Sequence, residues 1–398
     1  MHGSDNPYTP GAGWKPRKLA GREAELDQFR LLLDRMTRGN HESSPIFTGL
    51  RGVGKTVVLL ECEMLAREAG WATHDVYEVG SQADFRITFA KLATVLLRSM
   101  SLKKRMKARA TSALSVVKAF AEFAPPGFKF RLEVAPAVGK ADSGDPEEDL
   151  ADLLDEIGQV ARVGGTGAVF IIDELQNLDA RSLAAISMAF QRMVKKNLPV
   201  ALVGAGLPTV SDGLFAAKGY SDRLFNHYKL NELSRAAARA ALIAPAAVLG
   251  VEYTPEAVEY ILDETQGYPY FIQEYGRVAW NESESSPIGL EVIKVVRATV
   301  RERLADNFYG RRFKQGTDTE QRYMAAMASL GGDGPFLTPE VSAAYGAKST
   351  RGTSLQRDGL IKKGLAWSPR HRHVAFTVPR FAEFIREFYP LDELDLGT

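Results

Sequence analysis

One short segment, residues 49–56, constrains the fold of this chain more than any other feature. Its letters, GLRGVGKT, match the pattern G-x-x-x-x-G-K-[ST] at every fixed position. The glycines let the backbone curl so that successive N–H groups face one anion. An apolar strand is predicted at 45–48 and a helix at 55–69, so the positive end of that helix faces the same point. The pattern therefore predicts a phosphate-binding loop in an α/β fold.

The side chains of this loop fit a nucleoside triphosphate with its metal ion. Lys55 can reach the β- and γ-phosphates, and the Thr56 hydroxyl can ligate Mg²⁺. ATP and Mg²⁺ are therefore the predicted cofactors. We expect further nucleotide contacts along the loop and at the start of the helix, at Gly49, Gly52, Gly54 and Val57.

A second motif ends an apolar run. Five apolar residues, 168–172, are followed by Asp173 and Glu174. Such a run predicts a buried strand, which delivers both acids to the carboxyl end of a parallel sheet, where α/β proteins hold their ligands. Asp173 would hold Mg²⁺ through water, and Glu174 would act as general base on the attacking water. A pair of helix N-cap residues before Leu175 is the alternative.

The pattern of predicted elements divides the chain. Strands and helices alternate up to about residue 231, which indicates a parallel sheet covered on both faces. Helical patterns alone follow, and from residue 320 the order helix, turn, helix, turn, helix, hairpin, helix predicts a winged helix-turn-helix. The expected parts are an N-terminal arm at 1–18, an ATP-binding domain at 19–231, a helical lid at 232–286, a winged-helix domain at 287–390 and an acidic tail at 391–398.

Together these motifs resemble an AAA+ ATPase of the replication-initiator (origin-recognition-like) branch and the related STAND-type ATPases. The resemblance covers nearly all of the chain. It implies an α/β P-loop NTPase fold, with an AAA+-like parallel sheet, a helical lid and a C-terminal winged helix. Residues 19–26, which include Gly21 and Arg22, are similar to the family's N-terminal box near the adenine. An ordinary helix start is the alternative interpretation.

Two further segments resemble motifs of the family. Residues 221–225 are similar to the box with an arginine finger, which implies that Arg223 reaches the γ-phosphate of a neighbouring subunit in a homo-oligomer. Residues 265–270 are similar to the Gly-x-Pro motif of the lid, which implies that Pro269 lies against the nucleotide. The alternatives are a surface arginine in a loop and a corner built on Gly and Pro.

The chain departs from the family pattern in two places. The strand predicted at 199–203 should end in a polar residue that senses the γ-phosphate, but residues 204–208 read GAGLP. Gln176 or Asn177 could substitute for it. The lid also lacks an arginine at the usual place, and Arg277 lies one turn further along the helix. We therefore expect slow hydrolysis without a partner, whereas nucleotide binding is retained.

The predicted winged helix is strongly basic. Its recognition-helix candidate spans 350–363 and its wing 367–376, and Asp358 is the one acid between residues 348 and 372. A wing touches the backbone or minor groove of DNA. The candidates for DNA contact are Arg351, Arg357, Lys362, Arg370 and Arg372, with Lys348 and Lys363 beside them. Contact with a protein, or a purely structural use, is the alternative.

Two other segments bear on partners. A basic block could track phosphates, but it could also be a solvated face or pair with the acidic run 142–156. Its members are Arg98, Lys103, Lys104, Arg105, Lys107 and Arg109. The N-terminal arm carries Tyr8 and Trp14, and it either lies on a neighbouring subunit or packs on its own domain.

Composition excludes several other classes. The net charge is +1, so no field of the whole molecule favours nucleic acid or membrane. The single cysteine, Cys62, cannot build a disulfide framework and fits a reducing cytoplasm. No apolar stretch is long enough to span a membrane, and neither a cluster of metal ligands nor a catalytic triad stands out. We expect a cytoplasmic protein with no membrane partner.

Two functions are compatible with these features. The first is a DNA-binding ATPase whose nucleotide state controls loading or assembly on double-stranded DNA, and the basic winged helix favours it. The second is a STAND-like switch or scaffold that binds a protein partner. The missing polar sensor and the Gly-x-Pro motif favour this second function.

Overall fold

A computed structural model describes residues 3–394 except 12, 14, 15, 17, 18, 81–83, 103–105, 129, 212, 213 and 215–220. Residue contacts divide the chain into two compact units. The sheet unit comprises Arg22–Gly49 and Lys55–Leu230. The helical unit comprises Met1–Gly21, Leu50–Gly54 and Asn231–Thr398, so the central part of the glycine-rich loop belongs to it by its contacts.

The sheet unit is built on five parallel strands. In spatial order these are β2 (Tyr77–Glu78), β3 (Ala168–Asp173), β4 (Val200–Gly206), β1 (Ser44–Thr48) and β5 (Phe225–Lys229). Strands β1, β3 and β4 are buried along their whole length, as expected for parallel strands covered on both faces. The predicted α/β fold is confirmed.

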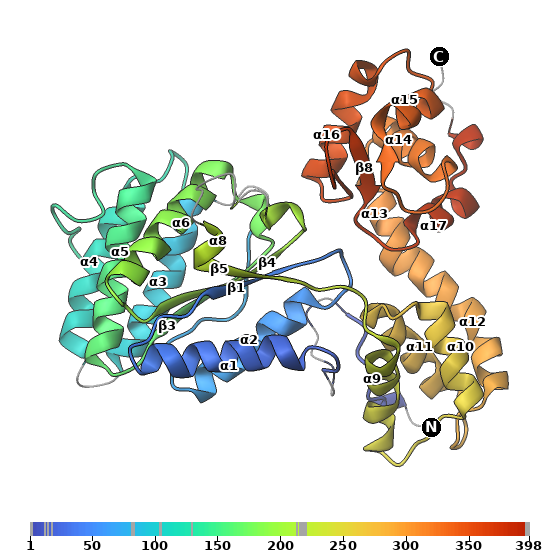
Figure 1. Ribbon diagram of the computed structural model, residues 1–398, viewed down its shortest axis with the longest axis horizontal. Helices are drawn as coiled ribbons and strands as arrows, with labels where there is room; N and C mark the ends of the chain where they lie inside the picture. Colours follow the sequence, from blue (N-terminus) through green and yellow to red (C-terminus); the bar gives the residue numbers. More distant parts are fainter. Residues whose placement is uncertain are drawn as a thin grey trace. The chain divides into compact units, whose positions relative to one another are not determined.

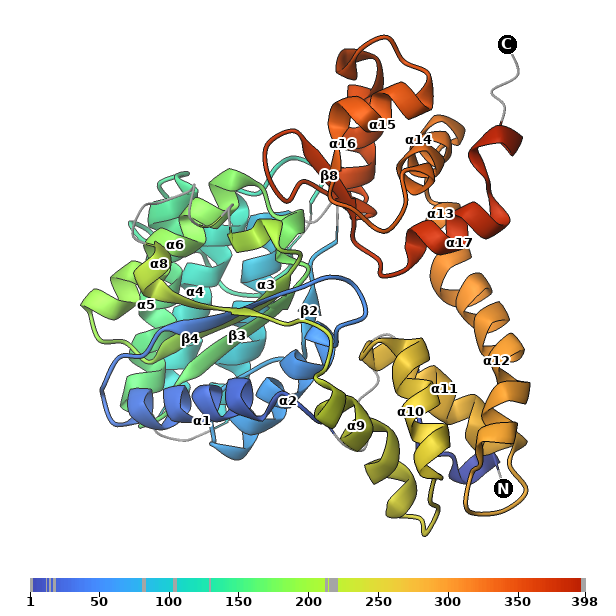
Figure 2. The ribbon, with the colours of Figure 1, turned by 45° about the vertical axis from the view of Figure 1, so that its right-hand side comes forward.

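Helices cover both faces of this sheet. Figures 1 and 2 show α1 and α2 on one face, and α3 to α6 gathered over the other. Aspartate side chains cap three of these helices: Asp84 at α3, Asp145 at α5 and Asp179 at α6. The helical elements are α1 (Glu23–Thr37), α2 (Lys55–Glu68), α3 (Phe85–Ser101), α4 (Lys107–Glu122), α5 (Pro146–Val163), η2 (Leu175–Asn177), α6 (Ala180–Lys195) and α8 (Ser221–Leu224).

Two segments of this unit differ from expectation. A strand was predicted at 71–79, but regular pairing is confined to β2, with an isolated bridge between Ala72 and Ala168. The segment 128–138, for which a hairpin or an extended insert was predicted, contains no strand among its described residues. A buried ion pair lies near this insert, because the Arg86 guanidinium is 2.7 Å from the Asp149 carboxylate. Asp149 also accepts hydrogen bonds from the backbone of Ser143 and Gly144.

The helical unit begins with four helices and ends in a mixed module. The first group is α9 (Arg235–Ala247), α10 (Pro255–Thr265), α11 (Pro269–Glu282) and α12 (Leu290–Leu304). A π-helical segment, η3 (Ala305–Gly310), and the short α13 (Arg311–Phe313) then lead into the C-terminal module. One apolar core runs through the unit and joins Phe271 of α11, Phe308 of η3 and Phe381 of the last helix, α17 (Phe381–Phe388).

The C-terminal module extends from α14 to α17. Its short strands form an antiparallel sheet in the order β6-β8-β7. The predicted succession of helices and hairpin is present, with the short strand β6 in addition. The elements are α14 (Asp318–Ser329), β6 (Phe336–Leu337), α15 (Thr338–Tyr345), η4 (Thr350–Thr353), α16 (Ser354–Lys362), β7 (Ala366–Trp367), β8 (His373–Phe376) and α17 (Phe381–Phe388).

The N-terminal arm lies on the first helices of the same unit. Tyr8 is 3% exposed, and its hydroxyl donates to the Leu242 carbonyl oxygen at 2.5 Å. Its ring occupies the space above Gly276 of α11, where a methyl group would come within 2.5 Å of the ring. The arm therefore packs on helices of its own chain, while Trp14 lies outside the described residues. Among the described residues, no helix is long and apolar enough to cross a membrane.

Candidate nucleotide-binding site

The glycine-rich loop connects β1 to α2, as the sequence predicted. Gly52 and Gly54 adopt φ values of +87° and +92°, a region that other residues enter only with strain. A methyl group on Gly54 would meet nothing within 4 Å, so backbone conformation rather than space explains this glycine. The Gly49 N–H donates to the Gly206 carbonyl oxygen at 3.2 Å, which ties the start of the loop to the end of β4.

The two functional side chains of the loop lie where α2 begins. Lys55 is 8% exposed, and its ammonium donates to the Gly49 carbonyl oxygen at 3.0 Å. The Thr56 hydroxyl donates to Oδ2 of Asp173 at 2.6 Å. The sheet thus brings together two residues that are far apart in the sequence. Val57, the next candidate, lies within α2.

These oxygen atoms fit a magnesium ion. Mg²⁺ binds to proteins through one or two oxygen ligands and completes its shell with water and phosphate oxygens. Thr56 and Asp173 present a hydroxyl and a carboxylate oxygen next to each other at the carboxyl end of β3. Among the described residues, no group of three or more His, Cys, Asp or Glu is placed to hold a metal ion. A metal ion at Thr56 and Asp173 would therefore need water and phosphate oxygens as its other ligands.

Glu174 follows directly and has an unusual backbone. Its φ is +57° and its ψ is +40°, a left-handed conformation that costs a non-glycine residue about 1–2 kcal/mol. Its N–H donates to Oδ1 of Asp173 at 2.8 Å. Its side chain makes no helix-cap hydrogen bond, which argues against a helix-capping role for Glu174.

Gln176 connects Glu174 to the neighbouring strand. Its amide nitrogen donates to Oε2 of Glu174, and its Oε1 accepts from the Leu207 N–H at 3.0 Å, just beyond β4. Gly206 makes room for this bridge, because a methyl group there would lie 2.6 Å from Gln176 Oε1. Gln176 therefore places a polar side chain beside the end of β4, where the strand itself has none. Asn177 is turned elsewhere and donates to the Val79 carbonyl oxygen at 2.6 Å.

The remaining nucleotide candidates lie in separate elements. Arg22 is 7% exposed at the start of α1. In the helical unit, Gly21 has a φ of +71°, and a methyl group on it would come within 2.6 Å of the Ala237 side chain. Pro269 is the first residue of α11, and it follows Gly267, where a methyl group would lie 2.4 Å from the Leu233 carbonyl oxygen. At both positions a side chain would clash with a neighbouring residue, which explains why each is glycine.

The two arginines proposed as phosphate ligands differ in their surroundings. Arg223 of α8 is exposed and makes no ion pair with any residue that the structure describes. Its carbonyl oxygen accepts from the Ser43 hydroxyl at 3.2 Å. Arg277 of α11, by contrast, is 2.5 Å from the buried carboxylate of Glu274. That ion pair occupies Arg277 within the helical unit.

The predicted DNA candidates lie in the C-terminal module, where all are exposed except Arg357, which is half-buried. Arg357 pairs with Asp358 at 2.9 Å, and Lys363 pairs with Glu320 of α14. The others make no ion pair with any described residue. We call this group the basic surface: Arg351 in η4, Lys362 at the end of α16, and Arg370 and Arg372 between β7 and β8.

Among the described residues, the other basic block does not pair with the acidic run. Lys103, Lys104 and Arg105 lie outside the described residues, and Arg98, Lys107 and Arg109 are exposed. The acidic run pairs instead with other bases, as the Arg192–Asp152 and Lys196–Asp155 pairs show at 2.8 and 2.9 Å. Among the described residues, no ion pair joins the two segments.

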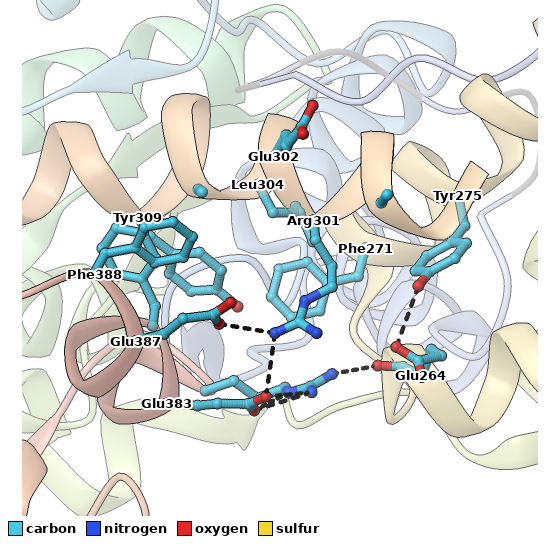
Figure 3. A pocket seen from close by; sticks show the side chains of 14 residues that line it. Glu264, Phe271, Tyr275, Arg301, Glu302, Leu304, Tyr309, Glu383, Glu387 and Phe388 are labelled. Carbon is cyan, nitrogen blue, oxygen red and sulfur yellow. Dashed lines mark hydrogen bonds and ion pairs between the residues drawn. The ribbon is translucent and has the colours of Figure 1, made fainter. Parts of the chain in front are cut away.

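A cavity of about 360 Å³ lies in the helical unit between α11, α12 and α17. Figure 3 shows that most of its charged side chains face one another, whereas Glu302 points away from them. Arg301 is 2.8 Å from Glu387, and Tyr275 donates to Glu264 at 3.3 Å. Arg380 is 3.0 Å from Glu383. Apart from Glu302, the charged side chains of this cavity are paired, so the glycine-rich loop remains the candidate site.

A loop of this form, together with a buried strand that ends in Asp173 and Glu174, is typical of the P-loop NTPase fold. Residues 18–203 match the family model of the AAA ATPase domain. This part of the chain is therefore similar to AAA ATPase domains, in agreement with the motifs. Residues 306–385 match a domain of unknown function (DUF8462). No curated protein matches the chain.

Several solved structures are similar over most of the chain. The Orc1 protein of Aeropyrum pernix, solved in complex with DNA, is 18% identical, with 96% of each chain covered and a TM-score of 0.45. The RuvB Holliday junction branch migration motor of Thermotoga maritima is 15% identical, with 92% of this chain and 96% of that chain covered and a TM-score of 0.44. Cdc6p from Pyrobaculum aerophilum is 14% identical, with 99% and 98% covered and a TM-score of 0.45. Because these values are low, function has to be inferred from this chain's own residues.

Proposed function

We propose that this protein binds ATP with Mg²⁺ at the glycine-rich loop and hydrolyses it slowly. The observation that carries the proposal is the contact between Thr56 and Asp173, beside Lys55 and Glu174. Lys55 would hold the β- and γ-phosphates, while Thr56 and Asp173 would hold the metal ion. Glu174 would orient the attacking water and accept its proton. Bound Mg²⁺ would neutralise part of the phosphate charge.

Slow turnover follows from the surroundings of Glu174. Its carboxylate is engaged by Gln176, which is held in turn by the Leu207 N–H. The end of β4 is glycine-rich and offers no side chain that could hydrogen-bond a γ-phosphate. A further positive charge would therefore have to come from a neighbouring subunit, for which the exposed Arg223 is the candidate. A homo-oligomer is part of this proposal.

Calorimetric titration with ATP and a steady-state hydrolysis assay test the ATPase proposal. Lys55→Ala should abolish measurable ATP binding, because it removes the buried cation of the loop. Arg223→Ala should leave binding by the monomer unchanged and lower hydrolysis only at concentrations where the protein assembles. Unaided hydrolysis at tens per second would contradict slow turnover, and ATP binding unaffected by Lys55→Ala would contradict the site itself.

We further propose that the nucleotide state controls binding of double-stranded DNA through the C-terminal module, which we interpret as a winged helix (287–390) next to a helical lid (232–286). The support is the basic surface, whose four cations are exposed and have no ion-pair partner in the described chain. Exposed arginine and lysine at the end of a helix and in a hairpin suit phosphate contacts. ATP can control DNA binding only if one arrangement of the lid binds ATP better than another arrangement does.

Fluorescence anisotropy with duplex DNA, in ATP, ADP or no nucleotide and across a salt series, tests this second step. Arg370→Ala/Arg372→Ala should weaken binding and lower the salt slope by about 1.8, or about 0.9 for each lost phosphate contact. Arg311→Ala/Lys314→Ala is the matched control, because both residues are exposed in the same unit and, like Arg370 and Arg372, make no ion pair with a described residue. Absence of DNA binding in all nucleotide states at about 0.15 M salt would contradict the proposal.

One observation favours a STAND-like switch that binds a protein partner. Leu355, the second residue of the candidate recognition helix α16, is 82% exposed. Contact with a protein partner would remove this large apolar side chain from water. Leu355→Asp should then abolish capture of a partner by the ATP-bound form. If DNA binding is lost equally in Leu355→Asp and the wing variant, the DNA function is favoured instead.

A further inference from the structure

Helix α3 of the sheet unit shows one narrow stripe to solvent, while its other faces are buried in the core of that unit. The stripe holds Lys91, Val95, Arg98 and, directly after the helix, Leu102, which keeps helical backbone angles. These positions follow the spacing i, i+4, i+7 and i+11, so they lie one above another along about 16 Å of the helix. We call them the outer stripe of α3.

The outer stripe combines two kinds of side chain that repeat along the helix. Leu102 is 86% exposed and Val95 is 48% exposed, although both are apolar. Lys91 and Arg98 are exposed and make no ion pair with any described residue. Seven residues separate the two apolar positions, and the same interval separates the two cations. A seven-residue repeat of apolar and charged positions is the pattern by which one helix packs along another.

The cations of this region are not explained by the stability of the helices that hold them. No acidic residue occurs in 85–121. Lys107 and Arg109 lie in the first turn of α4, where the positive end of the helix disfavours cations. Lys107 is exposed without an ion pair to a described residue, and Arg109 donates to the neutral amide of Gln159 at 2.6 Å. An anionic partner would compensate these charges.

The exposed apolar side chains distinguish between the possible anionic partners. The phosphates of DNA would attract the cations, but they offer no apolar surface to Leu102 and Val95. Helices that lie in a membrane surface bury a wide apolar face, whereas the outer stripe has two apolar side chains. A helix with acidic and apolar side chains satisfies both kinds of residue, because it can pair with the cations and remove the apolar groups from water.

We propose that the outer stripe of α3, together with Lys107 at the start of α4, binds a helical segment of a partner protein that presents acidic and apolar side chains at seven-residue spacing. The acidic side chains pair with Lys91, Arg98 and Lys107, and the apolar ones cover Val95 and Leu102. The ion pairs select the partner and speed its association, while apolar burial supplies most of the affinity. This inference goes beyond the proposed ATPase and does not depend on it.

Fluorescence anisotropy of a labelled synthetic peptide, titrated with the full chain across a salt series, tests this surface. The peptide is an amphipathic helix in which leucine and glutamate each recur every seven residues. Two matched peptides replace every glutamate with glutamine or every leucine with serine. The first peptide should bind, and its affinity should fall as salt rises. Both matched peptides should bind at least about tenfold more weakly, since each lacks one of the two contributions.

Variants of the protein assign the binding to the outer stripe. Arg98→Ala/Lys107→Ala should weaken binding of the glutamate–leucine peptide by about tenfold and reduce its salt dependence. Leu102→Ser should weaken binding to a similar extent and leave the salt dependence unchanged. Arg181→Ala/Lys195→Ala is the matched control, because it removes the same charge from exposed positions of α6 that make no ion pair with a described residue.

Several results would overturn the inference. Equal binding of the glutamine peptide would show that charge is not recognised, and unchanged binding in both stripe variants would place the contact elsewhere. Duplex DNA and vesicles of phosphatidylserine and phosphatidylcholine are titrated in parallel. Duplex binding lost in Arg98→Ala/Lys107→Ala but kept in Leu102→Ser would identify a phosphate surface instead. Vesicle binding lost in Leu102→Ser would identify a membrane surface instead.

Discussion

The nucleotide site and the basic surface of the C-terminal module hold their charges in opposite ways. In the first, Lys55, Thr56, Asp173 and Glu174 are engaged with one another or with the backbone, and Lys55 and Asp173 are buried. In the second, four cations are exposed and have no partner in the described chain. Buried polar groups must be satisfied and are therefore fixed in geometry. The exposed cations of the basic surface are held by neither packing nor ion pairs. Their positions show which part of a partner they could contact, but they do not identify the partner.

The largest effect that this comparison predicts is at Glu174. Glutamine keeps the size of the side chain and its hydrogen bond with Gln176, but it cannot accept a proton from water. Hydrolysis by Glu174→Gln should fall at least about a hundredfold, while ATP binds nearly as well as to wild type. A single-turnover assay with calorimetry checks both. Glu68→Gln, an exposed acid at the end of α2, is the control, and hydrolysis retained in Glu174→Gln would exclude Glu174 as the base.

A smaller effect is expected at Gln176, the residue that joins Glu174 to the end of β4. Gln176→Ala leaves the Leu207 N–H without its partner, which should cost about 1–3 kcal/mol of stability. It also releases the Glu174 carboxylate, so hydrolysis should change while ATP affinity does not. Urea unfolding and the hydrolysis assay measure the two consequences. If stability and rate are both unchanged, Gln176 is not part of the site.

The residues of the candidate nucleotide site could be named from sequence patterns. Each of its residues stands at a fixed place in a motif, and the strand and helix around it follow from periodicity alone. The role of Gln176 was harder to predict, because it depends on Gly206 lying beside it in space while 30 residues separate the two in sequence. The only sequence signal for this role was the missing polar residue at the end of β4. That signal suggested Gln176 and Asn177 equally.

Other features could not be predicted because they depend on long-range packing. Nothing in the sequence around Phe308 indicates that Gly52 of the loop lies beside it, since residues 50–54 are more than 250 positions away. In the C-terminal module, composition predicted a group of cations but not which of them are paired. The structure separates Arg357 and Lys363, which have carboxylate partners, from the basic surface.

This separation predicts a difference between two arginines of the module. Arg351→Ala should lower the salt slope of duplex binding by about 0.9, because an unpaired cation releases one counter-ion from DNA. Arg357→Ala should lower it less, since Asp358 already compensates that charge at 2.9 Å. Anisotropy across a salt series measures both under the same conditions. Equal slopes for the two variants would show that pairing within the chain does not determine which cations contact DNA.

The smallest effect concerns the pH dependence of stability, and it arises at the pair of Glu320 and Lys363. Burial alone would raise the pKa of Glu320, but hydrogen bonds from Lys363 and from Thr317 hold it below its usual value. A carboxyl group whose pKa is lower in the folded state stabilises the fold above its unfolded pKa of about 4.3. That contribution is lost as the pH falls through the folded pKa.

Lys363→Met should therefore reduce the loss of stability below about pH 4, and by less than about 1 kcal/mol because Lys363 is partly exposed. Asp333 acts in the opposite direction, since burial raises its pKa and its ionisation in the folded state is unfavourable. Comparing the Tm of wild type and Lys363→Met between about pH 3 and pH 6 cancels the Asp333 contribution, because both proteins share it. A difference between the two that grows in acid, rather than shrinking, would reverse the sign assigned to this pair.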